Sequence, residues 1–143
     1  MKTVRDVLKV KGHQVWSVGP DVTVYDTLKL MAEKEIGAVM VMEGDRPVGI
    51  FSERDYARQV ILKGKTSKDT PVRDVMTSRV FFVRPEQNLD ECMALMTDKH
   101  VRHLPVLQND ELIGVLSIGD VVKAVISEKE FIIEQLANYI SSG

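Results

Sequence analysis

The chain has 143 residues, of which 44% are hydrophobic and 28% charged, and its formal net charge is −2. This length suits one domain of ordinary size, and the hydrophobic content is too high for an intrinsically disordered chain. The nineteen basic and twenty-one acidic residues are mixed along the sequence, which argues against a broad basic surface for nucleic acid or an anionic membrane.

Cysteine content and the N-terminal segment narrow the class further. Cys92 is the only cysteine, so an intrachain disulfide and a cysteine-rich zinc site are excluded. Thr27 aligns with Cys92 in the repeat described below, and we expect Cys92 to be a small buried residue on a helix. Residues 1–14 lack an apolar core of signal-peptide length, and no stretch reaches the ~18 apolar residues of a membrane span. We therefore expect a cytoplasmic protein without membrane contact.

The sequence contains two copies of one unit. A shift of 65 residues aligns 18–61 with 83–126 without a gap, and 12 of the 44 aligned positions are identical. Chance would give about three identities for this composition. Upstream, "VRDVL" at 4–8 matches "VRDVM" at 72–76, with three extra residues before the proline of the first copy.

In chain order, each copy predicts a strand, a helix, two strands and a second helix. The apolar alternations at 15–18 and 80–83 indicate a first strand that ends before a proline. Capping boxes are expected at the start of the helix that follows, from the pairs Thr23–Asp26 and Asn88–Glu91. The next strands are the apolar runs at 38–42 and 104–107 and, after a polar turn, the segments at 48–52 and 113–117. The second helices are expected to begin near Asp55 and Asp120, and a further helix follows Ser127.

The predicted fold is α+β (α/β), with two pseudo-symmetric β-α-β-β-α repeats packed together and an added C-terminal helix. The expected boundaries are 3–62 for repeat 1, 63–71 for a linker, 72–126 for repeat 2 and 127–142 for the C-terminal amphipathic helix. That helix carries an apolar stripe at helical spacing, formed by Ile132, Leu136, Tyr139 and Ile140. The stripe packs on its own domain or meets a partner, and we favour a partner.

The candidate chemistry lies in a motif that occurs once in each copy. Ser52 and Asp55 lie in "GIFSERD" at 49–55, and Ser117 and Asp120 lie in "GVLSIGD" at 114–120, where a strand is expected to become a helix. A carboxylate there can accept hydrogen bonds from two adjacent hydroxyls, such as those of a ribose, and free N–H groups at the helix start favour an anion. The alternative is that these residues only cap the helix. Their presence in both copies favours a binding site.

The order of elements, the duplication and the paired "G-apolar-apolar-S-x-x-D" motif resemble a tandem CBS-domain pair, also called a Bateman module. The segment 74–126 resembles the family pattern almost throughout, whereas the first copy has "GAVMV" where the second has "RHLPV". The resemblance covers about residues 3–126. In detail it points to the stand-alone CBS-pair proteins of bacteria and plants.

The resemblance implies an apolar slot for adenine beside each motif. For the second motif it implies a slot formed by Val115 with the first copy's Val15, Ile36, Gly37 and Ala38. For the first motif it implies a slot formed by Ile50 with Thr77, Val80 and Val101. Taken singly, each of these residues is as well explained as part of the core.

The two sites are expected to differ in their phosphate contacts. Arg102 and His103 stand at the start of a strand, where family members place basic residues against phosphates, although His103 can also be a partly buried structural histidine. The aligned residues of the first copy, Gly37 and Ala38, cannot hold a phosphate. Arg54 can reach one from the helix start, whereas Arg58, Lys11 and Lys65 have no defined role.

The sequence therefore predicts a regulatory module that senses adenine nucleotides (AMP, ADP, ATP or NAD(H)) and signals to another protein, most simply as a homodimer of CBS pairs. No catalytic residue, metal or catalytic cofactor is expected. An enzyme would have to use His13, His100 or His103 with the two aspartates, yet we find no nucleophile with a base, no metal-ligand spacing and no glycine-rich phosphate loop. A nucleotide-independent protein-interaction module is the other alternative. The sequence does not distinguish the nucleotides, the number of occupied sites, the partner or the orientation of a dimer.

Overall fold

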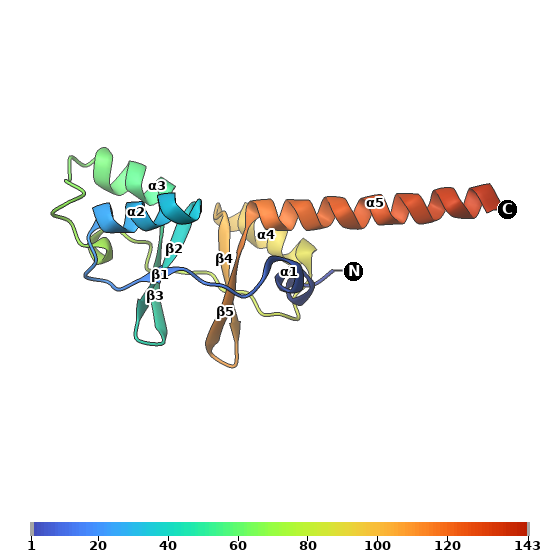
Figure 1. The fold of residues 1–143 in the computed structure, drawn as a ribbon, viewed down its shortest axis with the longest axis horizontal. Helices are drawn as coiled ribbons and strands as arrows, with labels where there is room; N and C mark the ends of the chain where they lie inside the picture. The colour runs from blue at the N-terminus through green and yellow to red at the C-terminus, as the bar shows by residue number, and fades with distance from the viewer. Residues whose placement is uncertain (1, 143) are drawn as a thin grey trace. The chain divides into compact units, whose positions relative to one another are not determined.

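The computed structural model describes residues 2–142 and divides into two compact units (Figure 1). The mid-chain unit is Gln14–Phe81, and the terminal unit joins Met1–His13 to Phe82–Gly143. Each unit therefore contains most of one sequence repeat, and the first residues of the chain belong with the second repeat. No helix within 2–142 is long and apolar enough to span a membrane.

The mid-chain unit is a three-stranded sheet with helices. Strand β1 pairs in parallel with β2, and β2 pairs antiparallel with β3. Buried side chains from both layers form one core, including Val24 and Met31 of the first helix and Phe51 of β3. Its elements are β1 (Ser17–Val18), α2 (Val24–Lys34), β2 (Ala38–Glu43), β3 (Arg46–Ser52), α3 (Glu53–Asp55), a π-helical segment (Tyr56–Ile61) and a 3-10 turn (Val72–Asp74).

The terminal unit repeats this plan with a two-stranded antiparallel sheet. Its elements are α1 (Val4–Lys11), α4 (Leu89–Lys99), β4 (His103–Gln108), β5 (Glu111–Ser117) and α5 (Ile118–Ser142). The predicted α+β fold of two pseudo-symmetric repeats is confirmed. The two strand pairs have identical burial patterns position by position, and both carry a β-bulge at the aligned steps Val41/Met42 and Val106/Leu107.

The helix caps follow the sequence with one difference. Asn88 and Glu91 form a complete capping box, as predicted. At the aligned helix the Thr23 hydroxyl accepts from the Asp26 N–H over 3.1 Å, but Asp26 does not return the bond, so Thr23 acts as an N-cap without a box. Both helices end at the same place, on a residue in the left-handed conformation, Glu35 or His100.

The first strand of the second repeat is much shorter than predicted. In the mid-chain unit, the Met40 N–H donates to the Trp16 carbonyl over 3.1 Å and extends the pairing upstream of β1. Pro105 occupies the aligned position in β4 and has no N–H to donate. Pairing in the second repeat therefore reduces to an isolated bridge between Val83 and Val106.

The first residues of each repeat pack on the other repeat. Val4 and Arg5 of α1 donate backbone hydrogen bonds to Gln87 and Pro85 over 2.9 and 3.0 Å. Leu8 packs so tightly on β5 that a Cβ added to Gly114 would lie 2.7 Å from its Cδ2. Residues 72–76 make the same contact in the mid-chain unit, where a Cβ at Gly49 would lie 2.5 Å from the sulfur of Met76.

The C-terminal helix is continuous with the second helix of repeat 2. The sequence predicts two segments here, 118–126 and 127–142. The structure has one helix, α5, from Ile118 to Ser142, because neither proline nor glycine interrupts it after Gly119. The C-terminal part of α5 extends past α1 and α4 of its own unit (Figure 1). The apolar side chains of this part are 46–78% exposed: Phe131, Ile132, Ile133, Leu136, Tyr139 and Ile140. Its apolar stripe is therefore not packed on the terminal unit.

Candidate functional site

The first Ser-x-x-Asp motif lies where β3 becomes α3. Asp55 accepts hydrogen bonds on Oδ2 from the backbone N–H and the hydroxyl of Ser52, at 2.9 and 3.0 Å. The Ser52 hydroxyl in turn accepts from the Asp55 N–H over 3.3 Å. Thr77 then donates its hydroxyl to Oδ1 of Asp55 over 2.8 Å. Both carboxylate oxygens of this motif are therefore engaged by the protein.

The second motif has the same frame but a different neighbour. The Ser117 N–H donates to Oδ2 of Asp120 over 2.8 Å, and the Asp120 N–H donates to the Ser117 hydroxyl over 3.1 Å. The ammonium group of Lys11 lies 2.6 Å from the same Oδ2 and also donates to the Val115 carbonyl. Both hydrogen bonds that Asp120 accepts from these groups end on one oxygen. Both motifs thus cap their helices, and the carboxylate of the second also holds a cation.

The charge of Asp120 is stabilised by these contacts. Partial burial alone would raise the pKa of Asp120, because it disfavours the charged form. The hydrogen bonds from Lys11 and from the Ser117 backbone, together with the positive charge of Lys11, outweigh burial and hold the pKa of Asp120 below its ordinary value of 3.8. The side chain is 25% exposed, so this anion is still accessible from solvent.

The residues before each middle strand lie beside the motifs. His103 is the cross-strand partner of Ser117, and the Ile118 N–H donates to the Arg102 carbonyl over 2.8 Å. Arg102 is exposed and His103 is half-buried. In the mid-chain unit Ala38 is likewise paired with Ser52. Arg102 and His103 therefore adjoin the second motif through their backbones, whereas Gly37 and Ala38 occupy the aligned positions at the first. The role of the two basic side chains in binding phosphate stays a prediction.

The predicted adenine-slot residues are divided between the units. Ile50 and Thr77 lie together, because their backbones exchange two hydrogen bonds of 2.9 Å, and Val115 lies on β5 two residues before Ser117. The mid-chain unit also holds Val15, Ile36, Gly37, Ala38 and Val80, whereas Val101 belongs to the terminal unit. The composition of the two slots stays a prediction.

Lys11 is the site residue whose role the sequence analysis leaves undefined. It lies 109 positions before Asp120, so no local pattern joins the two. The sequence match between 4–8 and 72–76 could have predicted its role. Because 77–81 lies near the first motif, the match places 9–13 near the second. The contact of His13 agrees with this placement, since its Nδ1 lies 3.2 Å from the Ile113 carbonyl.

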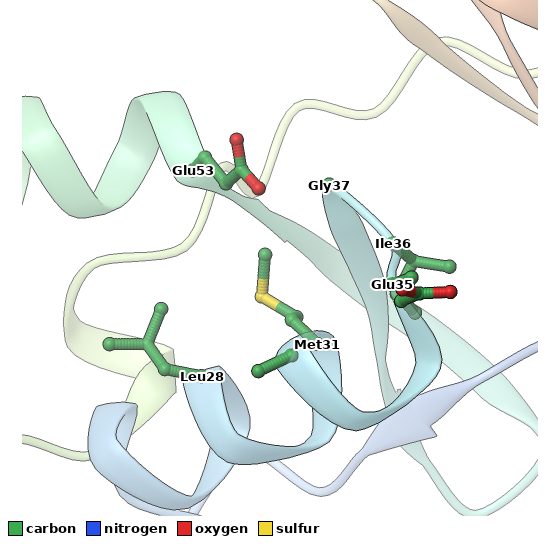
Figure 2. A pocket seen from close by; sticks show the side chains of 7 residues that line it. Leu28, Met31, Glu35, Ile36, Gly37 and Glu53 are labelled. Carbon is green, nitrogen blue, oxygen red and sulfur yellow. The ribbon is translucent and has the colours of Figure 1, made fainter.

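A cavity of about 290 Å³ lies between α2 and the start of α3 (Figure 2). Leu28, Met31 and Ile36 supply apolar walls, and the carboxylates of Glu35 and Glu53 lie at its rim. Two acidic side chains disfavour an anionic ligand, and neither Ser52 nor Asp55 lines the cavity. We therefore assign no nucleotide to it.

Cys92 and the acidic residues give no indication of other chemistry. Cys92 is buried, as predicted, and burial raises the pKa of its thiol to about 11, which keeps it protonated and unreactive near neutral pH. Within residues 2–142 no group of three or more histidine, cysteine, aspartate or glutamate side chains is placed to hold a metal ion.

Comparison with known proteins agrees with the duplicated architecture. The family pattern of the CBS domain matches residues 4–61 and 72–127. The chain belongs to the CBS-domain family. It is a CBS pair, and the resemblance seen in the sequence is confirmed.

Individual relatives extend this assignment. The chain is 40% identical to the mitochondrial CBS domain-containing protein CBSX3 of Arabidopsis thaliana, over 99% of this chain and 73% of the relative. A CBS-domain protein of Burkholderia ambifaria is similar in structure, with a TM-score of 0.86 and 51% identity over 88% of this chain and 95% of that one. A hexameric CBS-CP12 protein of bloom-forming cyanobacteria gives a TM-score of 0.74 at 27% identity, over 85% of this chain and 70% of that one.

Proposed function

We propose that this CBS pair senses adenine nucleotides and passes the signal to a separate protein. The ligand is AMP, ADP, ATP or NAD(H), bound beside the Ser-x-x-Asp motifs. The observation that carries the proposal is the motif frame found twice, in which an aspartate at a strand-to-helix junction accepts from the serine three residues before it. At the second motif this aspartate is held in its charged form, is partly exposed and is paired with Lys11. A helix cap alone would not need the ammonium group of Lys11 beside Asp120.

The side chains at the second motif suit the parts of a nucleotide. Oδ1 of Asp120 faces no donor among the hydrogen bonds described above, and a carboxylate oxygen can accept from the vicinal hydroxyls of a ribose. We expect Lys11, Arg102 and His103 to provide cationic or hydrogen-bonding groups for phosphate. At the first motif we expect Arg54 in this role, and the difference in basic residues predicts that the two sites bind with unequal affinity.

Signalling requires a partner protein, and two features support the presence of a protein-binding surface. The apolar face of α5 beyond Glu128 is exposed in the chain, and a relative with the same fold assembles as a hexamer. We propose that the CBS pair forms a homodimer and that a second protein reads its ligand state. The compartment stays a prediction, since one relative carries a mitochondrial name.

The same exposed face supports a second candidate, a protein-interaction module that needs no nucleotide. The two candidates differ in a thermal-shift panel with AMP, ADP, ATP, NAD, NADH, S-adenosylmethionine and GTP. A ligand that binds only the folded state raises the melting temperature by mass action. A concentration-dependent rise with one or more adenine nucleotides, and not with GTP, supports the proposal. Flat curves for every compound would favour the interaction module.

A further inference from the structure

The two motif sites differ in the side chain that contacts the aspartate from the sheet edge. In the mid-chain unit, the backbone of Thr77 pairs with Ile50 through two 2.9 Å hydrogen bonds, and its hydroxyl donates to Asp55. In the terminal unit, Val115 aligns with Ile50, and its carbonyl accepts instead from the side chain of Lys11. A neutral hydroxyl at one site is therefore replaced by an ammonium group at the other.

The position of Lys11 is set by the chain on both sides of it. Helix α1 ends at Lys11, and Gly12 turns the chain with a φ of 100°, in the left-handed region that favours glycine. His13 then contacts the Ile113 carbonyl at 3.2 Å, two residues along β5 from Val115. The segment 11–13 thus follows the free edge of β5, and the lysine is directed to the motif by two anchors besides its own ion pair.

An ammonium group has three N–H donors. Within residues 2–142, one is used by Oδ2 of Asp120 and one by the Val115 carbonyl, so the third can serve a further acceptor. These hydrogen bonds also involve only one of the two carboxylate oxygens of Asp120, because Lys11 and Ser117 both donate to Oδ2. The ion pair therefore presents an anionic oxygen and a cationic N–H next to each other, on side chains that are 25% and 35% exposed.

We propose that Lys11 makes the second-motif site selective for ligands that carry phosphate, with its ammonium donating to a phosphate oxygen while Asp120 accepts from the ribose. This inference rests on the proposed function and adds its specificity. The first-motif site has Thr77 in place of Lys11 and discriminates less between a nucleotide and its nucleoside. One nucleotide thus satisfies both partners of the ion pair without breaking it.

The test compares adenosine, AMP and ATP by isothermal titration calorimetry, with Lys11→Met as the test variant. Methionine keeps much of the length of the side chain and removes its charge. We expect AMP and ATP to lose about tenfold in affinity, the low end for a charge-assisted contact at a partly exposed site. Adenosine should lose less than about threefold, and added salt should reduce the wild-type preference. Lys11→Arg should retain most of the preference.

Two controls separate this inference from others. Lys9→Met removes an equal charge from the exposed side of α1 and should leave all three affinities unchanged. Repeating the titrations in an Asp55→Asn background reports the second-motif site by itself. Equal losses for adenosine and ATP in Lys11→Met, or no loss at all, would overturn the role of Lys11 while leaving nucleotide binding in place. If wild type binds none of the three ligands, this inference fails, and the thermal-shift panel with ADP, NAD and NADH decides whether the proposed function fails with it.

Discussion

The hydroxyl of Thr77 lies 2.8 Å from Oδ1 of Asp55, which joins the start of repeat 2 to the motif of repeat 1. The backbone of Thr77 is bound to Ile50 at the same place, by two hydrogen bonds of 2.9 Å. The start of repeat 2 is therefore part of the first-motif site. Its conformation and that of Asp55 depend on each other.

Replacing Thr77 with valine should destabilise the protein modestly. Valine has nearly the same shape, so the packing is retained while Oδ1 of Asp55 loses its donor. Loss of one such bond costs about 0.5–1.5 kcal/mol, and partial exposure favours the lower half of that range. Urea unfolding should show a lower midpoint with an unchanged slope. Ser78→Ala, one residue further in an exposed position, is the matched control, and an equal midpoint for both variants would show that the bond contributes nothing.

Alanine at Gly114 should be more harmful than alanine at Gly119. A Cβ at Gly114 would lie 2.7 Å from Cδ2 of Leu8, which is fully buried, whereas at Gly119 the nearest atom is the Ser117 hydroxyl at 3.6 Å. Overpacking costs about 1–3 kcal/mol, while Gly→Ala inside an open helix position stabilises by up to about 1 kcal/mol. Thermal unfolding of both variants should give opposite shifts. A Gly114→Ala protein as stable as wild type would mean that α1 moves away from β5 at little cost.

The sequence repeat predicted most of the fold because each helix and strand could be predicted twice, once from each copy. Helical spacing, N-caps and apolar strands agreed between the copies, and the structure confirms them. The sequence could also have predicted that no full strand forms at 80–83, since Pro105 lacks the N–H that Met40 uses at the aligned position. It could have predicted one continuous α5 too, because neither proline nor glycine lies between Ile126 and Ser142.

No local sequence pattern predicts that α1 packs on the second repeat. Residues 4–8 are amphipathic whichever repeat they cover, and only the contact of Leu8 with Gly114 decides the partner. The ion pair of Lys11 with Asp120 follows from that contact. A site residue contributed by tertiary packing leaves no spacing signal in the sequence, whereas Ser117 and Asp120, three residues apart, do.

Arg102→Ala should weaken binding of a multiply phosphorylated ligand more than binding of adenosine. Arg102 is exposed and precedes β4, and its carbonyl accepts from the Ile118 N–H at the start of α5. Loss of a charge-assisted contact costs roughly 1.5–3 kcal/mol, or about ten- to a hundredfold in affinity. Calorimetry with adenosine and ATP measures the difference. Arg84→Ala, which removes another exposed arginine of the terminal unit, should change neither affinity. Equal losses for the two ligands in Arg102→Ala would remove it from the phosphate role.

The ion pair of Lys11 and Asp120 should stabilise the fold at neutral pH and lose its effect in acid. The pKa of Asp120 lies below its ordinary value of 3.8 in the folded protein, so the unfolded chain takes up its proton first as the pH falls. The contribution is complete above the unfolded pKa and disappears as the pH drops through the lower folded pKa. For a partly exposed pair it amounts to about 0–1 kcal/mol.

This pH dependence is measured as the stability difference between wild type and Lys11→Met, by urea unfolding from about pH 7 to about pH 3. The pKa of Asp6 is also lowered, mainly by hydrogen bonds from Thr3, but these bonds are present in both proteins and cancel in the difference. We expect a constant gap from neutral pH down to about pH 5, which closes below about pH 4. A gap of the same size at both ends of the range would show that Lys11 acts through packing and not through charge.

Asp120→Asn should weaken nucleotide binding while the chain still folds. The amide oxygen can still accept from the Ser117 N–H, so the helix cap survives, but the side chain presents one acceptor instead of two and loses its attraction for Lys11. At roughly 1.5–3 kcal/mol for hydrogen bonds to a charged group, affinity should fall about ten- to a hundredfold. Asp110→Asn, an exposed turn residue of the same unit, removes the same charge and should bind as wild type does.

A deoxynucleotide then tests whether the ribose is the group that Asp120 holds. Removing the 2′-hydroxyl from the ligand should lower its affinity for wild type. The same removal should lower the affinity of Asp120→Asn much less, because the two changes remove the same interaction. Asp55→Asn makes the equivalent test of the first motif, and the double variant should bind almost nothing. Calorimetry on the three variants with both ligands completes the cycle. If the double variant binds every nucleotide as tightly as wild type, both motifs are helix caps alone, and the nucleotide site must lie elsewhere.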